Sequence, residues 1–489
     1  MKKFDVVILG GGISGSLFAL NLINSNKNLS ILILDKKIKS KLKVGEATAD
    51  LSSIFLNRLG INHLLKEQTK KTGLRFIFNE KNSSKKKDFL EFASPSFKGI
   101  SNGYHLNRTV FDSELLLECK KKGITILKPV ELNDVKFQKN KCILDVTYKG
   151  HSSKIESCWF IDASGKFRYI KNKLNWTDKK IPLNTGAISA HFTNLTPHSL
   201  WDRESTTYWE KNAIGSKSYS TTHFLKSNSW WWFIKLDEIT TSIGVVYDKN
   251  KVKFNDPEFY FTEKINEDKL LNEITKDAKR SKLNHINSLP YICTKMHHDN
   301  IAVIGDSGSF IDPLFSPGLE ITSQQNEYLV FLLLDYFKKG NKNLKAWKKY
   351  EQEFTKTYLD RAYVYSKIYN IMHSYDLFSN ITQFLFFGYQ SFNVFPLKHF
   401  PKRLKKPLRF HKIEKFFIKS LFNRYNRIIM KREKYNRKSS SLKQPLSYST
   451  VKIPNGLCIL IKPFQLFFLW LFNYLKIELT ELIYLFKKT

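Results

Sequence analysis

Asp5-Val-Val-Ile-Leu-Gly-Gly-Gly-Ile-Ser-Gly-Ser16 is the stretch of this 489-residue chain that decides its fold. A short apolar segment runs into a G-x-G-x-x-G turn made by Gly10, Gly12 and Gly15, and a helix-like apolar stretch follows at once. A second apolar segment then ends on Asp35, about twenty residues past the last glycine. This order of strand, glycine turn, helix, strand and acidic residue predicts a dinucleotide-binding βαβ unit.

Each glycine of this turn has its own physical role in such a unit. Gly10 permits the tight turn, Gly12 lets the backbone approach a pyrophosphate, and Gly15 lets the helix pack closely on the strand. The helix N-terminus offers free N–H groups and the positive end of the helix dipole to phosphates. Asp35 can accept hydrogen bonds from a ribose hydroxyl. We therefore expect these four residues to bind the cofactor.

Two later segments have the form of further nucleotide-binding turns. In the first, a strand ends in the small-residue turn Asp162-Ala-Ser-Gly165, where backbone can pass close to a nucleotide. In the second, Gly305-Asp306 follows a buried strand, and a loop with two prolines enters a helix near Gly318. The Asp306 carboxylate can bind a ribityl or ribose hydroxyl, and the helix start at Gly318 can receive negative charge.

The three motifs, in this order and spacing, resemble the FAD-dependent monooxygenase superfamily that shares the p-hydroxybenzoate hydroxylase fold. The resemblance covers about residues 1–380. It implies that FAD lies across the first domain, with its isoalloxazine facing an antiparallel sheet. The segment Tyr104–Asp112 also resembles one in which an arginine approaches FAD, which implies that role for Arg108.

Two further segments resemble the flavin-dependent halogenases of the tryptophan halogenase type. They are Val44-Gly-Glu-Ala-Thr48 and Trp230-Trp-Trp-Phe-Ile-Lys235. In that family, reduced flavin, dioxygen and halide yield hypohalous acid, which crosses a tunnel to an electron-rich arene. The resemblance implies that Lys71 is the lysine that holds it there, and that Glu46 belongs to the catalytic site. The residues it places around substrate or halide are Trp230, Trp232, Phe315, Ser316 and Gly318.

Each of these assignments has a structural alternative. Lys71 lies near Lys66 and Lys70 in a lysine-rich chain and can be an ordinary surface lysine. Glu46 can position the loop and flavin, or simply cap the following helix. The tryptophans can be a core strand of the sheet.

This sequence departs from the halogenase pattern at three positions, and each departure bears on whether the family's mechanism applies to this chain. Phe315 stands where tryptophan halogenases carry a glutamate, a loss shared with phenol- and pyrrole-type halogenases, which indicates a change of substrate class. Pro317 stands where a backbone N–H would hold halide, and proline has no N–H. Gly318 could still donate one. Lys235 replaces the proline of the tryptophan motif.

The expected fold class is α/β with α+β character, and the chain divides into regions of different pattern. Aromatic and β-branched alternation after residue 175 predicts an antiparallel sheet. The polar stretch Asn79–Lys87 is expected to be a surface loop. The expected parts are a Rossmann-type FAD-binding domain (1–174 and 296–345, with strands near 4–9, 30–34, 142–148 and 157–162), an inserted antiparallel-sheet substrate domain (175–295), a helical substrate or cap region (346–397) and a basic and apolar C-terminal tail (398–489).

The formal net charge of +36 has two interpretations. It can indicate an anionic partner, or it can reflect A+T-rich coding, which enriches lysine; we favour the second for the body of the protein. The five cysteines form no C-x-x-C, which argues against a disulfide framework or a metal site and suits a reducing compartment. The N-terminal apolar run has no signal-peptide cleavage pattern, so a cytoplasmic location is expected.

The tail combines the basic block Lys398–Lys443 with the apolar segment Leu457–Phe486. Its longest uncharged run, Phe464–Leu475, is too short to span a bilayer. Two interpretations stay open: an interfacial amphipathic helix on an anionic membrane surface, and a helix packed on the protein's own core.

Three functions are therefore considered. The first is a halogenase-like enzyme that uses reduced FAD, dioxygen and halide on an electron-rich aromatic or carrier-bound substrate. The second is an FAD-dependent monooxygenase, reductase or desaturase of a hydrophobic lipid or polyene. A basic nucleic-acid-binding protein ranks last, because no nucleic-acid module is recognised. No second glycine motif with strand context is present, so we expect a partner reductase to supply reduced FAD, or NAD(P)H to bind transiently.

Overall fold

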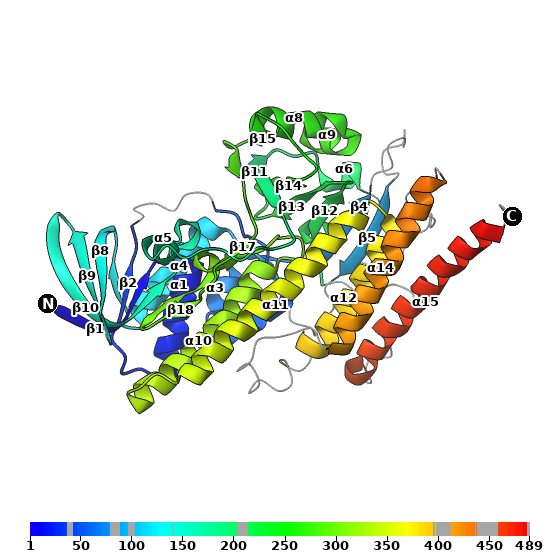
Figure 1. The fold of residues 1–489 in the computed structure, drawn as a ribbon. Helices are drawn as coiled ribbons and strands as arrows, with labels where there is room; N and C mark the ends of the chain where they lie inside the picture. Colours follow the sequence, from blue (N-terminus) through cyan, green and yellow to red (C-terminus); the bar gives the residue numbers. More distant parts are fainter. Residues whose placement is uncertain are drawn as a thin grey trace.

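Two large sheets and a set of long C-terminal helices make up the protein (Figure 1). The computed structural model describes residues 1–36, 43–78, 89–95, 103–138, 140–202, 214–394, 397, 412–435, 437 and 458–486. The loop expected at Asn79–Lys87 lies outside these residues, as do residues 398–411, 436 and 438–443 of the basic block.

The first sheet is the parallel sheet that the N-terminal stretch predicts. Its strand order is β18-β19-β10-β1-β2-β7, and a hairpin of β8 and β9 extends β10. The neighbours of β1 on its two sides, β2 and β10, both run parallel to it. The four predicted strands are confirmed. The bounds are β1 (Lys2–Leu9), β2 (Ile31–Leu34), β7 (Thr125–Leu127), β8 (Val130–Gln138), β9 (Lys141–Tyr148), β10 (His151–Asp162), β18 (His297–His298) and β19 (Ile301–Val303).

Helices lie beside this sheet, and the first of them begins just after the carboxyl end of β1. Helix α1 (Ile13–Ser25) follows the glycine turn and packs against α4 (Arg108–Lys121) and α10 (Pro317–Lys339). The predicted helix near Gly318 is therefore confirmed as α10. Because the chain leaves β1 for β2 on one side and β10 lies on the other, the crevice above β1 is the switch point where such sheets bind ligands.

The second sheet is the expected antiparallel one, with order β15-β11-β14-β13-β12-β4-β5 and β16 paired to β11. Strands β4 and β5 come from the part of the chain assigned to the FAD-binding domain, so a boundary at residue 174 does not separate the two sheets. Strand β12 pairs with β4 in parallel, which sequence alternation alone does not reveal. The bounds are β4 (Gly73–Phe78), β5 (Leu90–Pro95), β11 (Thr185–Thr193), β12 (Thr221–Leu225), β13 (Ser229–Lys235), β14 (Thr241–Asp248), β15 (Lys279–Arg280) and β16 (Asn284–Ile286).

Smaller elements connect and cover these sheets. Helix α8 packs on the face of the second sheet that carries Trp231, whose ring lies 4.9 Å from that of Phe261. The helices are α2 (Asp50–Arg58), α3 (Asn62–Lys66), α5 (Tyr169–Lys173), α6 (His198–Trp201), α8 (Pro257–Glu267) and α9 (Lys269–Thr275). The short strand pairs are β3 (Thr69–Lys70) with β6 (Tyr104–His105), and β17 (Tyr291–Ile292) with β20 (Ser309–Phe310).

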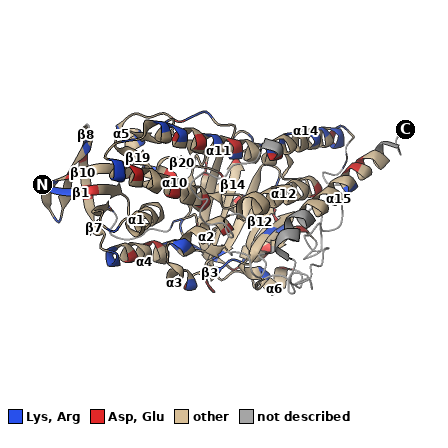
Figure 2. Ribbon diagram, turned by 90° about the horizontal axis from the view of Figure 1, so that it is seen from below, with Lys and Arg blue, Asp and Glu red and all other residues tan. Residues whose placement is uncertain are grey.

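The C-terminal helices run alongside both sheets and extend beyond them (Figure 1). They are α11 (Leu344–Ile371), α12 (Tyr375–Tyr389), the π-helical segment η4 (Gln390–Val394), α14 (Lys412–Lys434) and α15 (Cys458–Phe486). Lys and Arg gather along α11 and α14 (Figure 2). Helix α15 packs on α12. Among the described residues, no helix has the length and apolar character needed to cross a bilayer.

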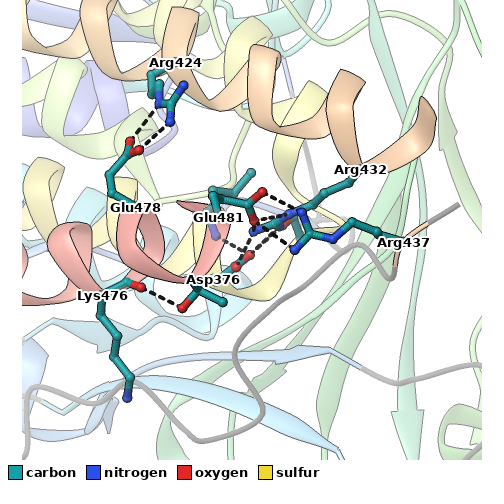
Figure 3. A network of polar contacts seen from close by, with 10 residues as sticks. Asp376, Arg424, Arg432, Arg437, Lys476, Glu478 and Glu481 are labelled. Atoms are coloured by element: carbon teal, nitrogen blue, oxygen red, sulfur yellow. Dashed lines mark hydrogen bonds and ion pairs between the residues drawn. The ribbon is translucent and has the colours of Figure 1, made fainter. Parts of the chain in front are cut away.

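A buried ion network fastens α15 to the body of the protein (Figure 3). The guanidinium of Arg432, in α14, donates to Asp376 at 2.8 Å and to Glu481, in α15, at 2.7 Å. Arg437 donates to the same glutamate at 2.7 Å. One face of α15 therefore packs on the protein's own core, as the second interpretation of the tail requires.

Candidate active site

The glycine turn has the steric form that the sequence predicts. Gly10 has a φ of +115°, and a Cβ placed on it would lie 2.3 Å from the Ala163 carbonyl oxygen. A Cβ on Gly15 would lie 2.0 Å from the carbonyl oxygen of Gly10. At Gly12, by contrast, the nearest atoms to a Cβ would be 3.8 Å away. Gly12 is the N-cap of α1 and has no side chain to cap the helix, so room for an anion remains at this helix start.

Charged residues surround the turn. A Cβ on Gly11 would lie 3.2 Å from Asp35 Oδ2, so the Asp35 carboxylate borders the turn, where it also pairs with Lys128 at 3.2 Å. The atoms nearest Gly12 belong to Asp112 and Lys43, which pair with each other at 2.5 Å. Sequence reasoning missed Lys43. This cation lies beside the uncapped helix start, which suits a pyrophosphate.

Arg108 fastens the loop before Glu46 to α4. It donates to Asp112 Oδ1 at 2.8 Å and to the Gly45 carbonyl at 3.1 Å. Burial acts to raise the pKa of Asp112, but the charges of Arg108 and Lys43 hold that pKa below its usual value. The ion pair therefore stays charged and fixes the loop.

The second turn is held from within by its aspartate. Asp162 is fully buried, and its carboxylate accepts from the backbone N–H groups of Ser164 at 2.9 Å and Ile170 at 2.7 Å. Its contact with a cofactor is therefore indirect, because both oxygens are used to shape the turn. Gly165 has a φ of +65° with open space beside it, and its N–H donates to Ser307 Oγ at 2.9 Å.

The third turn meets the first. Gly305 has a φ of +62°, and a Cβ there would lie 2.3 Å from the Ser14 hydroxyl, in the first turn of α1. Burial raises the pKa of the half-buried Asp306, and the charges of Lys166 and Arg108 oppose that rise. The three predicted turns therefore converge at the carboxyl ends of β1, β10 and β19.

Lys71 is a buried residue, so the interpretation as an ordinary surface lysine is wrong. Only 5% of it is exposed, and its Nζ donates to the Thr48 carbonyl at 3.2 Å. A Cβ on Gly103 would lie 2.6 Å from that same oxygen, so the absence of a side chain there makes room for the contact. Burial lowers the pKa of Lys71 to about 8, and the Asp50 carboxylate opposes the shift.

Glu46 connects the loop to the second sheet. It is 1% exposed, and its Oε1 lies 2.6 Å from His191 Nε2, on β11. Its Oε2 is buried without a hydrogen-bond partner among the described residues. The helix-cap interpretation is wrong, because the N-cap of α2 is Ala49 and no side chain caps it.

Asp50 is a site residue that sequence reasoning missed. It begins α2, two residues after Thr48, and accepts a hydrogen bond from Gln390 at 3.1 Å. Burial raises its pKa to about 6, against the hydrogen bond from Gln390 and the charge of Lys71. Nothing in its sequence context marks it, because the partner amide lies 340 residues away.

The loop before α10 carries the aromatic ring of Phe315 at the position where tryptophan halogenases have a glutamate. The Phe315 ring centre lies 5.8 Å from that of Tyr365 and 5.9 Å from that of Phe76. Ser316 is left-handed, with a φ of +56°, and its N–H donates to the Pro313 carbonyl at 2.9 Å. Gly318 is exposed with open space around it. The Ser316 N–H is used in this bond and Pro317 has no N–H, so Gly318 is the one of the three whose N–H could hold a halide.

Trp230 and Trp232 are both buried in β13, as the core-strand interpretation expects. Their place around substrate stays a prediction. Trp230 Nε1 donates to the Tyr369 hydroxyl at 3.0 Å, which in turn donates to Asp312 at 2.6 Å. Trp232 Nε1 donates to Ser242 at 3.2 Å. The network fixes Asp312, directly before the loop that carries Phe315.

Comparison with known proteins agrees with this geometry. The sequence profile of the family described as tryptophan halogenase matches residues 5–94 and 75–369. A 1H-pyrrole-2-carbonyl-[peptidyl-carrier protein] chlorinase of Pseudomonas fluorescens is 25% identical over 342 residues, which are 65% of this chain and 73% of that protein. The flavin-dependent halogenase armH1 of Armillaria mellea is 23% identical over 65% of this chain and 62% of its own length.

A solved structure shares the fold. The halogenase PltM, in complex with phloroglucinol and FAD, superposes with a TM-score of 0.74 over 89% of this chain and 93% of its own, at 19% identity. Family membership rests on the profile, which covers the glycine turn, Lys71 and the loop at Phe315. The chain belongs to the tryptophan halogenase family and is an FAD-dependent, halogenase-like oxidoreductase.

Proposed function

We propose that this protein halogenates an electron-rich arene of the phenol or pyrrole type, free or bound to a carrier protein. The observation that carries the proposal is the buried ammonium of Lys71, held against the Glu46–Thr48 loop with Asp50 nearby. A buried lysine at a fixed position can donate a hydrogen bond to hypohalous acid and aim it at a substrate. FAD supplies the activation of dioxygen from which that acid forms.

The residues of the first sheet suit FAD. We place the pyrophosphate at the uncapped start of α1, beside Gly12 and Lys43, and the adenosine ribose near Asp35. We further propose that Asp306, Arg108 and Gly165 face the isoalloxazine end of FAD. Glu46 connects the loop after Gly45 to the second sheet through His191.

The partners follow from the same chemistry. We propose that a separate reductase delivers reduced FAD, because the chain shows no second glycine motif for a nicotinamide. Cys119, Cys142, Cys158 and Cys293 are free thiols in the structure, which supports a reducing compartment.

The substrate class follows from Phe315. Because a ring stands where a carboxylate would assist deprotonation, we expect substrates whose own hydroxyl or N–H enriches the ring. With reduced FAD and bromide, phloroglucinol and a pyrrole-2-carboxyl thioester on a carrier should gain bromine, while free tryptophan should not. Mass spectrometry of the products checks this. Bromination of tryptophan in preference to phenols would contradict the substrate class while leaving halogenation intact.

The pH dependence of halogenation should be bell-shaped. Lys71 acts as the ammonium, so activity should fall as pH rises through about 8, where the lysine loses its proton. It should also fall as pH drops through about 6, where Asp50 becomes neutral and no longer supports that charge. The profile of kcat/KM for pyrrole, whose N–H does not titrate in this range, measures both limbs. Asp50→Asn should be poorly active and lack the acid limb, and its basic limb should move to lower pH, because the carboxylate that raises the pKa of Lys71 is gone. A flat wild-type profile would contradict the assignment.

A further inference from the structure

Helix α15 carries an exposed apolar stripe. Six of its residues are each between 47% and 65% exposed: Phe468, Phe472, Leu475, Leu479, Leu482 and Ile483. Each lies three or four residues from another member of the set. This spacing puts them on one side of the helix, over a length of about 22 Å. Figure 1 shows α15 at the outer edge of the protein. Soluble surfaces rarely leave so continuous a set of large apolar side chains uncovered.

The opposite side of α15 is anchored, so the stripe has a fixed direction. Trp470 and Ile477 are buried against the core. Asn473 donates to Gln383 of α12 at 3.0 Å, and Asn380 of α12 donates to the Trp470 carbonyl at 3.2 Å. The stripe therefore points away from α12.

The acidic residues of α15 are turned inward. Glu478 accepts from Arg424 at 2.8 Å, and Glu481 lies in the network with Arg432 and Arg437 (Figure 3). Lys476 is exposed beside the stripe. Among the described residues of this helix, the outer side therefore carries no unpaired carboxylate.

Helix α14 adds positive charge next to the stripe. Lys419, Arg427, Lys431 and Lys434 are exposed on it, together with Phe416 and Met430. Lys431 of α14 and Leu482 of the stripe line the same hollow between the two helices. An apolar stripe flanked by exposed cations matches the interfacial region and headgroups of an anionic bilayer.

We propose that the protein lies on anionic lipid membranes through α15, with the stripe in the interface and the cations of α14 at the headgroups. A second copy of this chain fits less well, because a symmetric pairing would bring the same basic flanks together in a chain of formal net charge +36. The binding is peripheral, and it is independent of the reaction at Lys71.

Co-sedimentation of the full-length holoprotein with phosphatidylcholine vesicles, with and without phosphatidylserine, tests this. We expect binding to the anionic vesicles and little to the neutral ones. The stripe variant Phe472→Gln/Leu475→Gln/Leu479→Gln should bind at least tenfold more weakly. The matched variant Leu200→Gln/Ile239→Gln/Phe259→Gln removes three apolar residues elsewhere that are at least as exposed on average, and it should bind normally. Arg427→Gln and Lys431→Gln should each cost about fivefold.

Circular dichroism and FAD titration show that each variant is folded. Absence of binding to phosphatidylserine vesicles by folded wild-type protein would overturn the proposal, as would equal losses in the two triple variants. A dimer in solution that the stripe variant abolishes would assign the stripe to a second copy and would also overturn it.

Discussion

Lys71→Ala should reduce halogenation by about 100-fold to 10,000-fold while FAD binding stays unchanged. The expected size reflects the role proposed for the ammonium, which donates to the reacting acid at one fixed place. Burial and the contact with the Thr48 carbonyl hold it there, and alanine would leave no donor in its place. Lys71 is not among the residues placed around FAD, so flavin affinity should not change.

Lys70→Ala is the matched control. Lys70 is the neighbouring residue in β3 and is exposed, so its loss should leave halogenation within twofold of the wild type, as for most surface substitutions. Product formation with supplied reduced FAD measures activity, and fluorescence titration measures FAD affinity. Equal activity in Lys71→Ala and the wild type would remove the lysine from the mechanism.

Gly15→Ala should weaken FAD binding by more than about 100-fold. The new Cβ would lie 2.0 Å from the Gly10 carbonyl oxygen and 3.1 Å from the Ala163 Cβ, so α1 must move away from the turn. Overpacking of this kind costs about 3 kcal/mol at the upper end of its usual range, which corresponds to more than 100-fold in affinity. The start of α1 would then no longer meet the pyrophosphate.

Gly60→Ala separates crowding from backbone strain. Gly60 has a φ of +75° but nothing lies within 4 Å of an added Cβ, so this variant keeps the strain without the collision. We expect about 1 kcal/mol of lost stability and normal FAD affinity. Titration of both apoproteins with FAD gives the comparison. Wild-type affinity in Gly15→Ala would show that the turn tolerates a side chain.

Local pattern predicted the turns, strands and helices of the first sheet well. The glycine turn, the strands of the first sheet and the helix at Gly318 depend on neighbouring residues, so spacing alone is informative. The pairing of β4 with β12 and the contact of Glu46 with His191 join residues about 145 apart in the chain, which spacing does not encode. Lys71 needed the family resemblance, because its burial arises from the distant Gly103 and Thr48.

The C-terminal tail is a second case in which the sequence pattern did not decide the structure. The apolar and basic segments were visible in the sequence, but two interpretations remained because helical spacing does not say which face is covered. The structure divides α15 into a buried face at Trp470 and an exposed face at Phe472. The exposed face is the surface on which binding to an anionic membrane can be tested.

Halide-dependent turnover tests the central claim most directly. Purified protein is given reduced FAD, dioxygen and phloroglucinol, with and without bromide or chloride, and the products are weighed by mass spectrometry. We predict a halogenated product that forms only with halide and only with Lys71 present. An oxygenated or reduced product that forms equally with and without halide would contradict the account.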